Sequence, residues 1–376
     1  MTEIYLIRHA QAEGNRYRIM QGHWDGGVTE QGLRQIGLLA ERLREISFDA
    51  VYSSDLYRAR ITASAALRPE GPPLRTDPAL REINIGPWER QFFGNLLRDE
   101  AESALTFLND PARWRLEGAE TFAQVADRAL PVLEAIARRH EGGRAAVVSH
   151  GVTIRCLLGR ITGLDLRDKE KLPMSLNTAI TVLRWENGVF SPVSVNDAAH
   201  LGPLQERGWS SSATLRHEAL DPLRDREEYC AWYREAWLAS HGDLRGFVPE
   251  PYWAAAREHM RAEPGTVLRL LDGDRPVGLV DMDPRRGAAE GCGWLSLLVL
   301  DAAYRGKGYG VQALARALVR YRDEGRRALR LLAAEDNPAA LRFYAREGFR
   351  PVGEEQGSHG RLLLLERPLT ERREAP

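Results

Sequence analysis

The sequence predicts an α/β protein built from two domains, and three observations support this. The chain has 376 residues, which is more than a single hydrophobic core usually serves. Strand-like and helix-like segments alternate in both halves. Between the halves, residues 202–213 are rich in Gly, Pro and Ser and lack periodicity, which is typical of a linker. We therefore expect domains at 1–201 and 214–369, followed by a tail at 370–376.

The composition fits a globular protein, with 43% hydrophobic and 28% charged residues. The 52 basic and 53 acidic residues give a net charge of -1, so no nucleic-acid partner is expected. No stretch is long and apolar enough to span a membrane, and no apolar targeting segment follows Met1, so we expect no membrane partner and a cytoplasmic location. The three cysteines, Cys156, Cys230 and Cys292, are too far apart for a zinc cluster, and no metal is expected.

Elements of the first half follow from periodicity and capping. Residues 3–7 form a short apolar run with β-branched side chains, as in a buried strand, and Thr29 precedes a segment with helical spacing. The expected elements are strands at 3–7, 50–54 and 145–149, and helices at 29–46, 55–67, 121–139 and from Gly151 onward. This alternation predicts a parallel sheet. The dipeptide Asn187-Gly188 between two alternating runs predicts a closing β-hairpin.

Polar residues cluster where these strands end. His9 and His150 follow the strands at 3–7 and 145–149, and open α/β sheets place their ligand crevices at such strand ends. Amide groups at the start of a following helix favour an anion. Arg8 and Arg58 are further candidates, although an arginine on a helix is usually a solvated surface residue. Taken singly, each histidine is more often structural, so only the combination indicates a site.

A first resemblance rests on five pieces of sequence, "RHA" at 8–10, Asn15, "SSDLYRARITA" around Arg58, "LREINIGPWE" around Glu82 and "VVSHG" around His150. Over residues 3–201 their order and spacing resemble the histidine phosphatase superfamily. The resemblance implies a phosphoglycerate mutase-like domain, a three-layer α/β/α sheet. Two positions depart from the family pattern, because Ala10 and Arg90 stand where glycine is usual.

The resemblance implies hydrolysis of a small-molecule phosphomonoester. His9 would attack phosphorus and form a phosphohistidine, and Glu82 would protonate the leaving oxygen and later activate water. The implied phosphate-binding residues are Arg8, Asn15, Arg58, His150 and Gly151. The compact segment 89–119 favours a phosphatase, but phosphoglycerate mutase-type phosphoryl transfer stays open as the alternative.

The second half contains a glycine-rich turn at the start of a helix. A predicted strand ending near Leu300 is followed by glycines at 306, 308 and 310 and then by an amphipathic helix. Backbone amides in such a turn, helped by Arg305 and Lys307, can bind a pyrophosphate, although an ordinary connection explains a glycine-rich turn equally well. Further on, Asn337 and Pro338 open a helix that carries Tyr344 and stops at Gly348.

These two motifs resemble the GNAT acetyltransferases, specifically over about 290–352 and plausibly over 214–369. Arg305 to Gly310 fits the signature Q/R-x-x-G-x-G/A, and Phe343 to Phe349 fits "FYxxxGF". The resemblance implies a mixed α/β acyl-CoA-binding fold, acetyl-CoA held between splayed strands, and an amine as acetyl acceptor. Tyr344 would protonate the departing thiolate. The implied acetyl-CoA contacts are Leu298, Leu300, Arg305, Gly306, Lys307, Gly308, Gly310 and Asn337.

The acceptor side is less defined. Helices expected within residues 225–263 would cover the acceptor site, and the candidates for a general base are Asp281, Asp283 and Glu290. The sequence thus predicts a bifunctional enzyme, a histidine phosphatase followed by an N-acetyltransferase. The alternative for the second domain is a non-catalytic, regulatory role that binds acyl-CoA. Nothing in the sequence predicts an oligomeric state.

Overall fold

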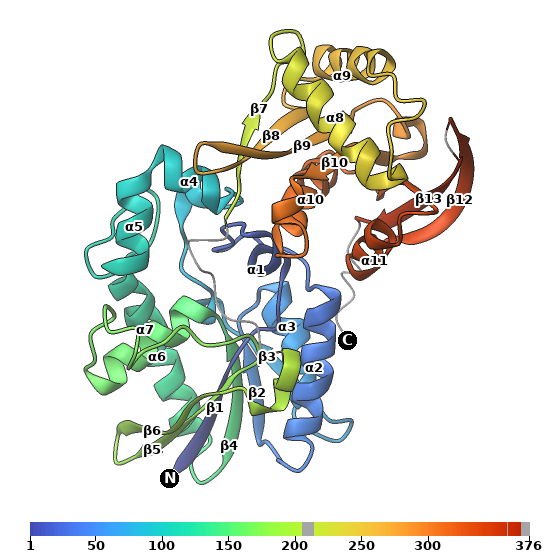
Figure 1. Ribbon diagram of the computed structural model, residues 1–376. Coiled ribbons are helices and arrows are strands. Elements are labelled where there is room, and N and C mark those ends of the chain that lie inside the picture. The colour runs from blue at the N-terminus through green and yellow to red at the C-terminus, as the bar shows by residue number, and fades with distance from the viewer. Residues whose placement is uncertain (205–213, 359, 370–376) are drawn as a thin grey trace. The chain divides into compact units, whose positions relative to one another are not determined.

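A computed structural model describes residues 1–204, 214–358 and 360–369 (Figure 1). The chain separates into two compact units, one on each side of residues 205–213. Residues 202–204 of the expected linker lie in a short 3-10 helix, while the rest of that linker and the expected tail lie outside the described residues. Within the described ranges, no helix combines the length and the apolar character needed to cross a membrane.

The first unit is built on a six-stranded sheet with the strand order β3-β2-β4-β1-β5-β6. Its strands are β1 Thr2–Arg8, β2 Ala50–Ser53, β3 Leu74–Thr76, β4 Arg144–Ser149, β5 Ile180–Glu186 and β6 Val189–Asp197. β1 to β4 pair in parallel, as predicted, whereas β5 and β6 run antiparallel. The predicted hairpin joins β5 to β6, and its turn residues Asn187 and Gly188 have φ of 52° and 81°, as a two-residue hairpin turn requires.

The helices of the first unit include those expected from Thr29, from Thr121 and from Gly151. They are α1 Glu13–Tyr17, α2 Glu30–Leu43, α3 Tyr57–Ala63, α4 Phe93–Asp99, α5 Ala101–Asn109, α6 Phe122–Arg139 and α7 Gly151–Thr162, with 3-10 helices η1 Ser64–Ala66, η2 Pro78–Leu80, η3 Gly86–Trp88 and η4 Ala199–Leu204. The side chains of Thr29 and Thr121 accept hydrogen bonds from amides in the first turns of α2 and α6. The helix expected at 55–67 is divided into α3 and η1.

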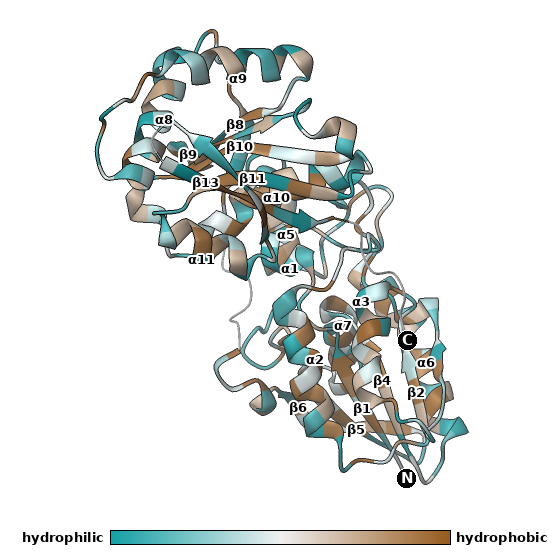
Figure 2. Ribbon diagram, turned by 90° about the vertical axis from the view of Figure 1, so that its right-hand side faces the viewer, coloured by the Kyte–Doolittle hydropathy of each residue, from teal (hydrophilic) through white to brown (hydrophobic). Residues whose placement is uncertain are grey.

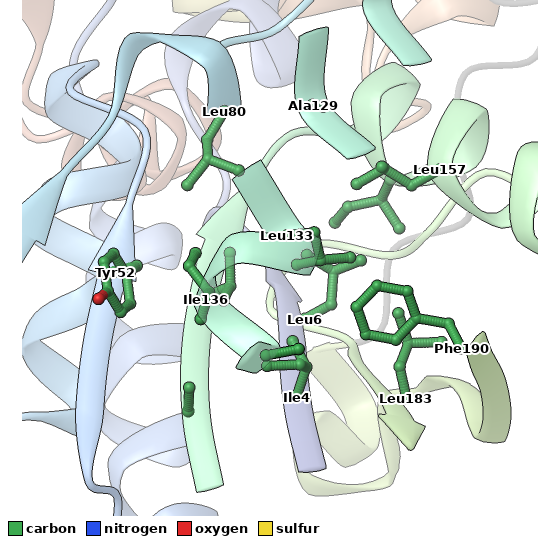
Figure 3. Packing of buried hydrophobic residues seen from close by; sticks show 14 of the residues in the cluster. Ile4, Leu6, Tyr52, Leu80, Ala129, Leu133, Ile136, Leu157, Leu183 and Phe190 are labelled. Atoms are coloured by element: carbon green, nitrogen blue, oxygen red, sulfur yellow. The ribbon is translucent and has the colours of Figure 1, made fainter. Parts of the chain in front are cut away.

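Both faces of this sheet are buried. On one face, Ile4 and Leu6 of β1 pack with Leu133 of α6 and Leu157 of α7 (Figure 3). On the other face, Ile7 packs in a cluster with residues of α2 and α3. A sheet buried on both faces needs helices on both sides, which gives the three layers. This packing fixes the ends of β1 and β4, where His9 and His150 follow.

The second unit has a seven-stranded sheet with the order β12-β13-β11-β10-β9-β8-β7. Its strands are β7 Arg216–Ala219, β8 Val267–Asp272, β9 Arg275–Asp283, β10 Cys292–Leu300, β11 Ala328–Ala334, β12 Arg350–Gly357 and β13 Gly360–Pro368. The helices are α8 Arg226–His241, α9 Glu250–Ala262, α10 Tyr309–Asp323 and α11 Pro338–Arg346, with η6 Ala288–Glu290 and η7 Ala302–Tyr304. Figure 2 shows that hydrophobic residues lie along the strands of each sheet.

The strands β10 and β11 part in the middle of this sheet. They pair in parallel only from Cys292 with Ala328 to Leu295 with Leu331. Beyond that point β10 stays paired with β9 as far as Leu300, and β11 stays paired with β13. The backbone edge of β10 that faces β11 is therefore unpaired in its second half. This is the splay that the acetyltransferase resemblance implies.

Helices α8 and α9 lie within the range expected to cover the acceptor site. Their aromatic side chains pack largely on one another, since the rings of Tyr233 and Tyr252 stack with centroids 4.0 Å apart. Tyr229 belongs to a buried cluster with Leu279 and Leu297 of the sheet. Most of this aromatic content therefore serves the core.

Candidate active sites

The ends of β1 and β4 bring His9 and His150 together. Arg8 is paired with Ser149 in the parallel ladder, and the amide of His9 donates to the carbonyl oxygen of Ser149 at 2.9 Å. His150 is the N-cap residue of α7. The two imidazole rings lie 5.1 Å apart between centroids, and both are buried. The predicted juxtaposition is therefore present.

The hydrogen bond of His9 determines which ring nitrogen carries the proton. Nδ1 lies 2.7 Å from the carbonyl oxygen of Ala10, and because a carbonyl only accepts, Nδ1 must carry the proton and leave a lone pair on Nε2. Burial, helped by the charges of Arg58 and Arg8, holds the pKa of His9 well below its ordinary value. His9 is therefore a neutral imidazole whose Nε2 carries the free lone pair.

Four buried polar atoms of residues near His9 have no hydrogen-bond partner among the described residues. They are Nε of Arg8, Nε of Arg58 and both ring nitrogens of His150. Unpartnered buried polar atoms are uncommon, because each costs desolvation free energy. Burial lowers the pKa of Arg8 to about 10, so its guanidinium is still charged at neutral pH. Two guanidinium groups with available N–H donors suit a phosphate dianion.

The terminal nitrogens of both arginines are anchored to the backbone. Arg58 is fully buried near the start of α3, and its NH1 and NH2 donate to the carbonyl oxygens of Trp24 at 2.9 Å and Gly22 at 2.7 Å. Arg8 donates through NH1 to the carbonyl oxygen of Ser175. Each guanidinium is thereby fixed before a ligand arrives, which lowers the cost of ordering on binding.

Asn15 and Ala10 have structural roles in addition to their place in the site. The side-chain oxygen of Asn15 accepts from the amide of Ala12 at 2.9 Å, so a phosphate contact from Asn15 would come from its Nδ2. The amide of Ala10 donates to Oγ1 of Thr62 at 2.9 Å, and that hydroxyl donates to the carbonyl oxygen of Arg58. Ala10 is buried without disturbing this chain of bonds.

The other departure from the family pattern, Arg90, lies at a left-handed backbone position. Its φ is 68°, a conformation that glycine adopts without strain and that other residues rarely adopt. A glycine is therefore the less strained residue at this turn, which gives a physical reason for its use in the family. Arg90 is exposed.

Gly151 provides the space for Arg8. A Cβ at this position would lie 3.2 Å from Nε and 3.3 Å from Cζ of Arg8, and 2.9 Å from Sδ of Met174. We expect Gly151→Ala to displace the Arg8 guanidinium and to lower kcat/KM for a phosphomonoester by about 10- to 100-fold. Gly159→Ala, on the same helix, is the matched control, since its Cβ would meet Leu166 at 2.9 Å and not Arg8. Equal losses of kcat/KM in both variants would contradict this explanation.

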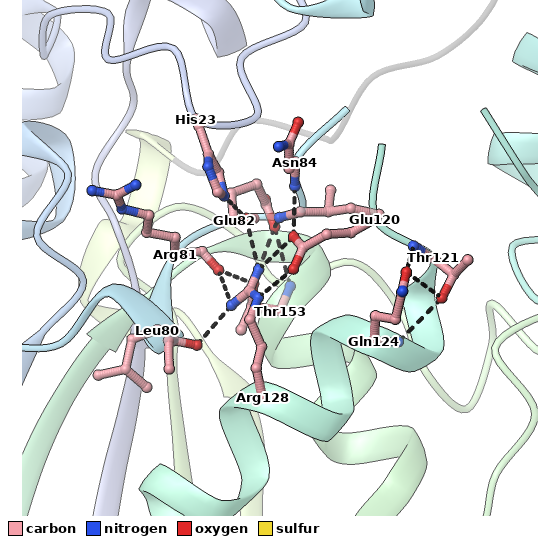
Figure 4. Close-up of polar contacts among 12 residues, drawn as sticks. His23, Leu80, Arg81, Glu82, Asn84, Glu120, Thr121, Gln124, Arg128 and Thr153 are labelled. Carbon is pink, nitrogen blue, oxygen red and sulfur yellow. Dashed lines mark hydrogen bonds and ion pairs between the residues drawn. The ribbon is translucent and has the colours of Figure 1, made fainter. Parts of the chain in front are cut away.

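Glu82 lies at the N-terminal end of α7. Its Oε2 accepts from the amide of Val152 at 3.2 Å, and its Oε1 accepts from the amide and hydroxyl of Thr153 at 3.2 and 3.3 Å (Figure 4). Since His150 caps the same helix, α7 positions both residues. The sequence pattern predicts Glu82 in the site but gives no indication of these contacts.

Three residues that support the site were not predicted. Asn177 donates through Nδ2 to the carbonyl oxygen of His9 at 2.8 Å. The other two are His23 and Arg128, which both contact the backbone carbonyl oxygen of Glu82. Nε2 of His23 lies 2.9 Å from this oxygen, and NH2 of Arg128 lies 2.8 Å from it. An arginine on an amphipathic helix resembles a solvated surface residue, so the sequence carries no signal for Arg128.

The two buried histidines predict a pH-dependent stability of the first domain. Burial also holds the pKa of His150 well below its ordinary value, so neither His9 nor His150 is protonated in the folded state when the unfolded chain takes up protons below about pH 6.5. The free energy of unfolding should therefore fall as pH decreases from 7.5 to 5, by up to ~1.4 kcal/mol per pH unit for each histidine. Above this range both histidines are neutral in the folded and the unfolded state, so neither makes the free energy of unfolding depend on pH.

Denaturant unfolding followed between pH 5 and 8 measures this dependence. The variant His150→Asn removes one of the two groups, so we expect a shallower decrease of the free energy of unfolding toward low pH than in the wild type. Identical slopes in the two proteins would show that His150 takes up its proton in the folded state as well.

In the second unit, the glycine-rich turn ends earlier than predicted. Gly306 and Gly308 have φ of 71° and 88°, and Gly308 is the N-cap of α10. Gly310 instead lies inside the first turn of α10, where a Cβ would come within 3.1 Å of the Phe343 ring. Gly310 therefore allows close packing of Phe343 on α10. The start of this 15-residue helix still suits a pyrophosphate, because the helix dipole favours negative charge there.

The charged residues of this turn differ in their contacts. Arg305 donates through Nε to the carbonyl oxygen of Leu300 at 2.8 Å and through NH2 to Glu235 at 2.6 Å, whereas Lys307 is exposed. Leu298 and Leu300 lie on the part of β10 that has separated from β11. The carbonyl oxygen of Leu300 already accepts a hydrogen bond from Arg305. Leu298 is therefore the better candidate of the two for a hydrogen bond with a pantetheine amide.

Asn337 and Tyr344 both lie on or next to α11. Asn337 caps this helix, since its Oδ1 accepts from the amide of Ala340 at 3.0 Å. Tyr344 is buried between the rings of Phe343 and Phe349. Burial raises the pKa of the Tyr344 hydroxyl, so it keeps its proton at neutral pH, as a general acid must.

Two of the three base candidates, Asp281 and Asp283, contact the same histidine side chain. Asp281 is buried, with Oδ1 2.8 Å from Nδ1 of His259 and Oδ2 accepting from the hydroxyl of Tyr229 at 2.9 Å. Asp283 lies 3.2 Å from Nε2 of the same histidine. Burial lowers the pKa of His259, but the two carboxylates outweigh it and raise the pKa overall. Glu290 lies in η6, before β10 begins.

Two general features of the described residues bear on cofactors. No group of three or more His, Cys, Asp or Glu side chains in residues 1–204, 214–358 and 360–369 is arranged to hold a metal ion. The three cysteines are free thiols.

Comparison with known proteins agrees with this geometry. The family model of the histidine phosphatase superfamily (branch 1) matches residues 4–198, and that of the acetyltransferase (GNAT) family matches residues 226–349. The chain is 33% identical over 172 residues to the probable phosphoglycerate mutase GpmB of Photorhabdus laumondii, which covers 46% of this chain and 80% of that protein. The Escherichia coli protein of the same name is 32% identical over 190 residues, 50% of this chain and 88% of its own length.

A solved structure supports the fold of the first domain. Bacillus stearothermophilus YhfR superposes with a TM-score of 0.51 and 29% identity, covering 54% of this chain and all of its own. Together with the matched family models, these similarities bear out the predicted two-domain organisation. The chain belongs to the histidine phosphatase superfamily, and its phosphatase-family domain is followed by a GNAT acetyltransferase domain.

Proposed function

We propose that the first domain hydrolyses a small-molecule phosphomonoester through a phosphohistidine on His9. The observation that carries this proposal is the group of four unpartnered buried nitrogens of Arg8, Arg58 and His150 around His9. A phosphoryl group can accept hydrogen bonds from these side chains while Nε2 of His9 faces phosphorus. Positioning and charge stabilisation account for most of the catalysis of phosphoryl transfer.

The reaction has two steps. In the first, Nε2 of His9 forms a bond to phosphorus as the ester oxygen leaves with a proton from Glu82. In the second, Glu82 takes a proton from water, the water oxygen bonds to phosphorus, and the bond to His9 breaks. Inorganic phosphate is released, and Glu82 ends in its initial protonation state. Both guanidinium groups hold the phosphoryl oxygens throughout.

A mutase activity is the second candidate for this domain, because two relatives that are 33% and 32% identical in sequence are named probable phosphoglycerate mutases. A mutase returns the phosphoryl group to the substrate and releases no inorganic phosphate. Assays with 2- and 3-phosphoglycerate that follow both the isomer and inorganic phosphate separate the two activities. We expect phosphate release to dominate, since only two short helices, α4 and α5, lie between η3 and α6.

Trapping the intermediate tests the proposal directly. Brief exposure to p-nitrophenyl phosphate followed by quenching in alkali, where phosphohistidine survives, should leave phosphate on the chain. Peptide mapping should locate it at His9. A wild-type enzyme that turns over but never carries phosphate would contradict the covalent route and would favour direct attack by water.

For the second domain, we propose acetyl transfer from acetyl-CoA to an amine. The separation of β10 from β11 after Leu295 supports a slot for pantetheine, and the start of α10 at Gly308 supports a site for the pyrophosphate. The residues nearest these features are Leu298 on β10, Gly306 in the turn and Asn337 at α11. As the amine nitrogen bonds to the acetyl carbon, the bond from that carbon to sulfur would break and Tyr344 would give its proton to the departing thiolate. The amine nitrogen would then lose a proton to solvent, and solvent would return a proton to Tyr344.

Replacing Tyr344 by Phe separates catalysis from binding. We expect Tyr344→Phe to lower kcat for acetyl transfer by about 100-fold, with the affinity for acetyl-CoA changed by less than about threefold, because the ring and its contacts are kept. Thiol release with a panel of small amines measures the first quantity and calorimetry the second. Acetyl-CoA binding without thiol release for any amine would favour the regulatory alternative, and no binding at all would contradict both.

A further inference from the structure

The loop that carries Glu82 is held by a side chain outside the predicted catalytic set, Arg128 of α6 (Figure 4). Residues 81–85 lie between η2 and η3, outside any strand or helix. Arg128 donates through NH1 to the carbonyl oxygens of Ala79 at 2.6 Å and Arg81 at 2.9 Å, and through NH2 to that of Glu82 at 2.8 Å. One guanidinium therefore satisfies three carbonyl groups around the acid-base residue.

Glu120 fixes this guanidinium and the far side of the loop. Its carboxylate accepts from Nε and NH2 of Arg128 at 2.7 and 2.9 Å. The same carboxylate accepts from the amide of Asn84 at 2.8 Å, and the amide of Glu120 donates to the carbonyl of Asn84 at 2.8 Å. Burial raises the pKa of Glu120, but the bonds from Arg128 and Asn84 lower it overall. The pair is thus charged and bidentate, a geometrically restrictive contact.

We propose that Arg128 is a positioning residue that aligns Glu82 for proton transfer, a role that rests on the proposed phosphatase function. The Glu82 carboxylate keeps its own bonds to the amides of Val152 and Thr153, so loss of Arg128 displaces Glu82 without removing it. A displacement of about 1 Å can cost on the order of 100-fold in rate. The step affected is the departure of the leaving oxygen, which needs the proton from Glu82.

The dependence on the leaving group distinguishes this role from a general effect on folding. An alkoxide is a poor leaving group and needs a proton, whereas p-nitrophenolate leaves readily without one. The parameter kcat/KM covers the steps up to departure of the leaving group. A misplaced Glu82 should therefore lower kcat/KM for an alkyl phosphate much more than for p-nitrophenyl phosphate, while a smaller folded fraction lowers both equally.

The test compares five full-length proteins on glycerol 2-phosphate and p-nitrophenyl phosphate: wild type, Glu82→Gln, Arg128→Met, Glu120→Gln and Arg139→Met. For Arg128→Met we expect kcat/KM to fall by about 10- to 100-fold on the alkyl ester and by less than about threefold on the aryl ester. Glu120→Gln should give a smaller change in the same direction and carries the test if Arg128→Met does not fold. Arg139 is exposed on the same helix, so Arg139→Met should leave kcat/KM for both esters unchanged.

Equal losses on both esters, or no loss on either, in both Arg128→Met and Glu120→Gln would overturn the proposal. Glu82→Gln serves as the reference, because it should show the largest difference between the two esters. If Glu82→Gln treats the esters alike, the acid role of Glu82 in the proposed function is itself overturned. A failure of the positioning role is thereby distinguishable from a failure of the reaction mechanism.

Discussion

His9→Asn is expected to abolish phosphomonoester hydrolysis, with kcat reduced by about 10⁴-fold or more. Asparagine can still donate to the carbonyl of Ala10, as Nδ1 of His9 does at 2.7 Å, so the backbone after β1 should keep its conformation. Its amide nitrogen carries no available lone pair and cannot attack phosphorus. The measurement is steady-state release of inorganic phosphate together with the amount of phosphate bound to the chain.

His150→Asn is the matched comparison. His150 contributes hydrogen bonds and not the nucleophile, so we expect its loss to slow turnover by about 10²- to 10³-fold while phosphate can still be trapped on His9. Turnover of His9→Asn within tenfold of wild type, or trapped phosphate that persists without His9, would mean that another residue is the nucleophile.

The fold of the first domain follows closely from local sequence signals. The Thr29 and Thr121 caps define where α2 and α6 begin, and Asn187-Gly188 defines the hairpin. The signals are strong because each is a local backbone requirement. The antiparallel pairing of β5 with β1 is not a local feature, because most of the domain's sequence lies between these two strands. In the sequence, only the hairpin indicated that antiparallel strands were present.

The sequence predicts that His9 and His150 lie together, and the structure has this arrangement, but the sequence gives no signal for the residues that hold the site in place. His9 and His150 come together because adjacent parallel strands end at the same edge of the sheet. Arg128 and Asn177 act through backbone carbonyl groups, and a side chain that binds a carbonyl leaves no residue-type pattern in the sequence. Such contacts become visible only when the loop path is known.

The second domain illustrates the same limit. The predicted turn and the Asn337 cap lie at the starts of α10 and α11, because glycine and asparagine have distinct backbone preferences. No such signal selects a general base among the candidates, because an aspartate is informative only through its neighbours. Asp281 is engaged by His259 and Tyr229, both more than 20 positions away in the sequence.

Arg58 should be the second most sensitive residue of the phosphatase site. We expect Arg58→Lys to lower kcat/KM by about 10³-fold, within the range that a single arginine contributes to phosphoryl transfer. A lysine has no planar fork, so one ammonium cannot donate to the carbonyls of Gly22 and Trp24 and to the phosphoryl group as the Arg58 guanidinium can. Arg60→Lys, on the same helix but only partly buried, should be close to wild type.

The pH dependence of Arg58→Lys provides a sharper test than its rate at one pH. Full burial already lowers the pKa of Arg58, and the same burial would act on a lysine, whose ordinary pKa is only about 10.4. The substituted ammonium is charged at low pH and loses its proton as pH rises, so kcat/KM of the variant should decrease between pH 7 and 9 relative to wild type. A constant ratio across this range would mean that the charge at position 58 is not what binds the phosphoryl group, and that the loss arises from the two carbonyls left without donors.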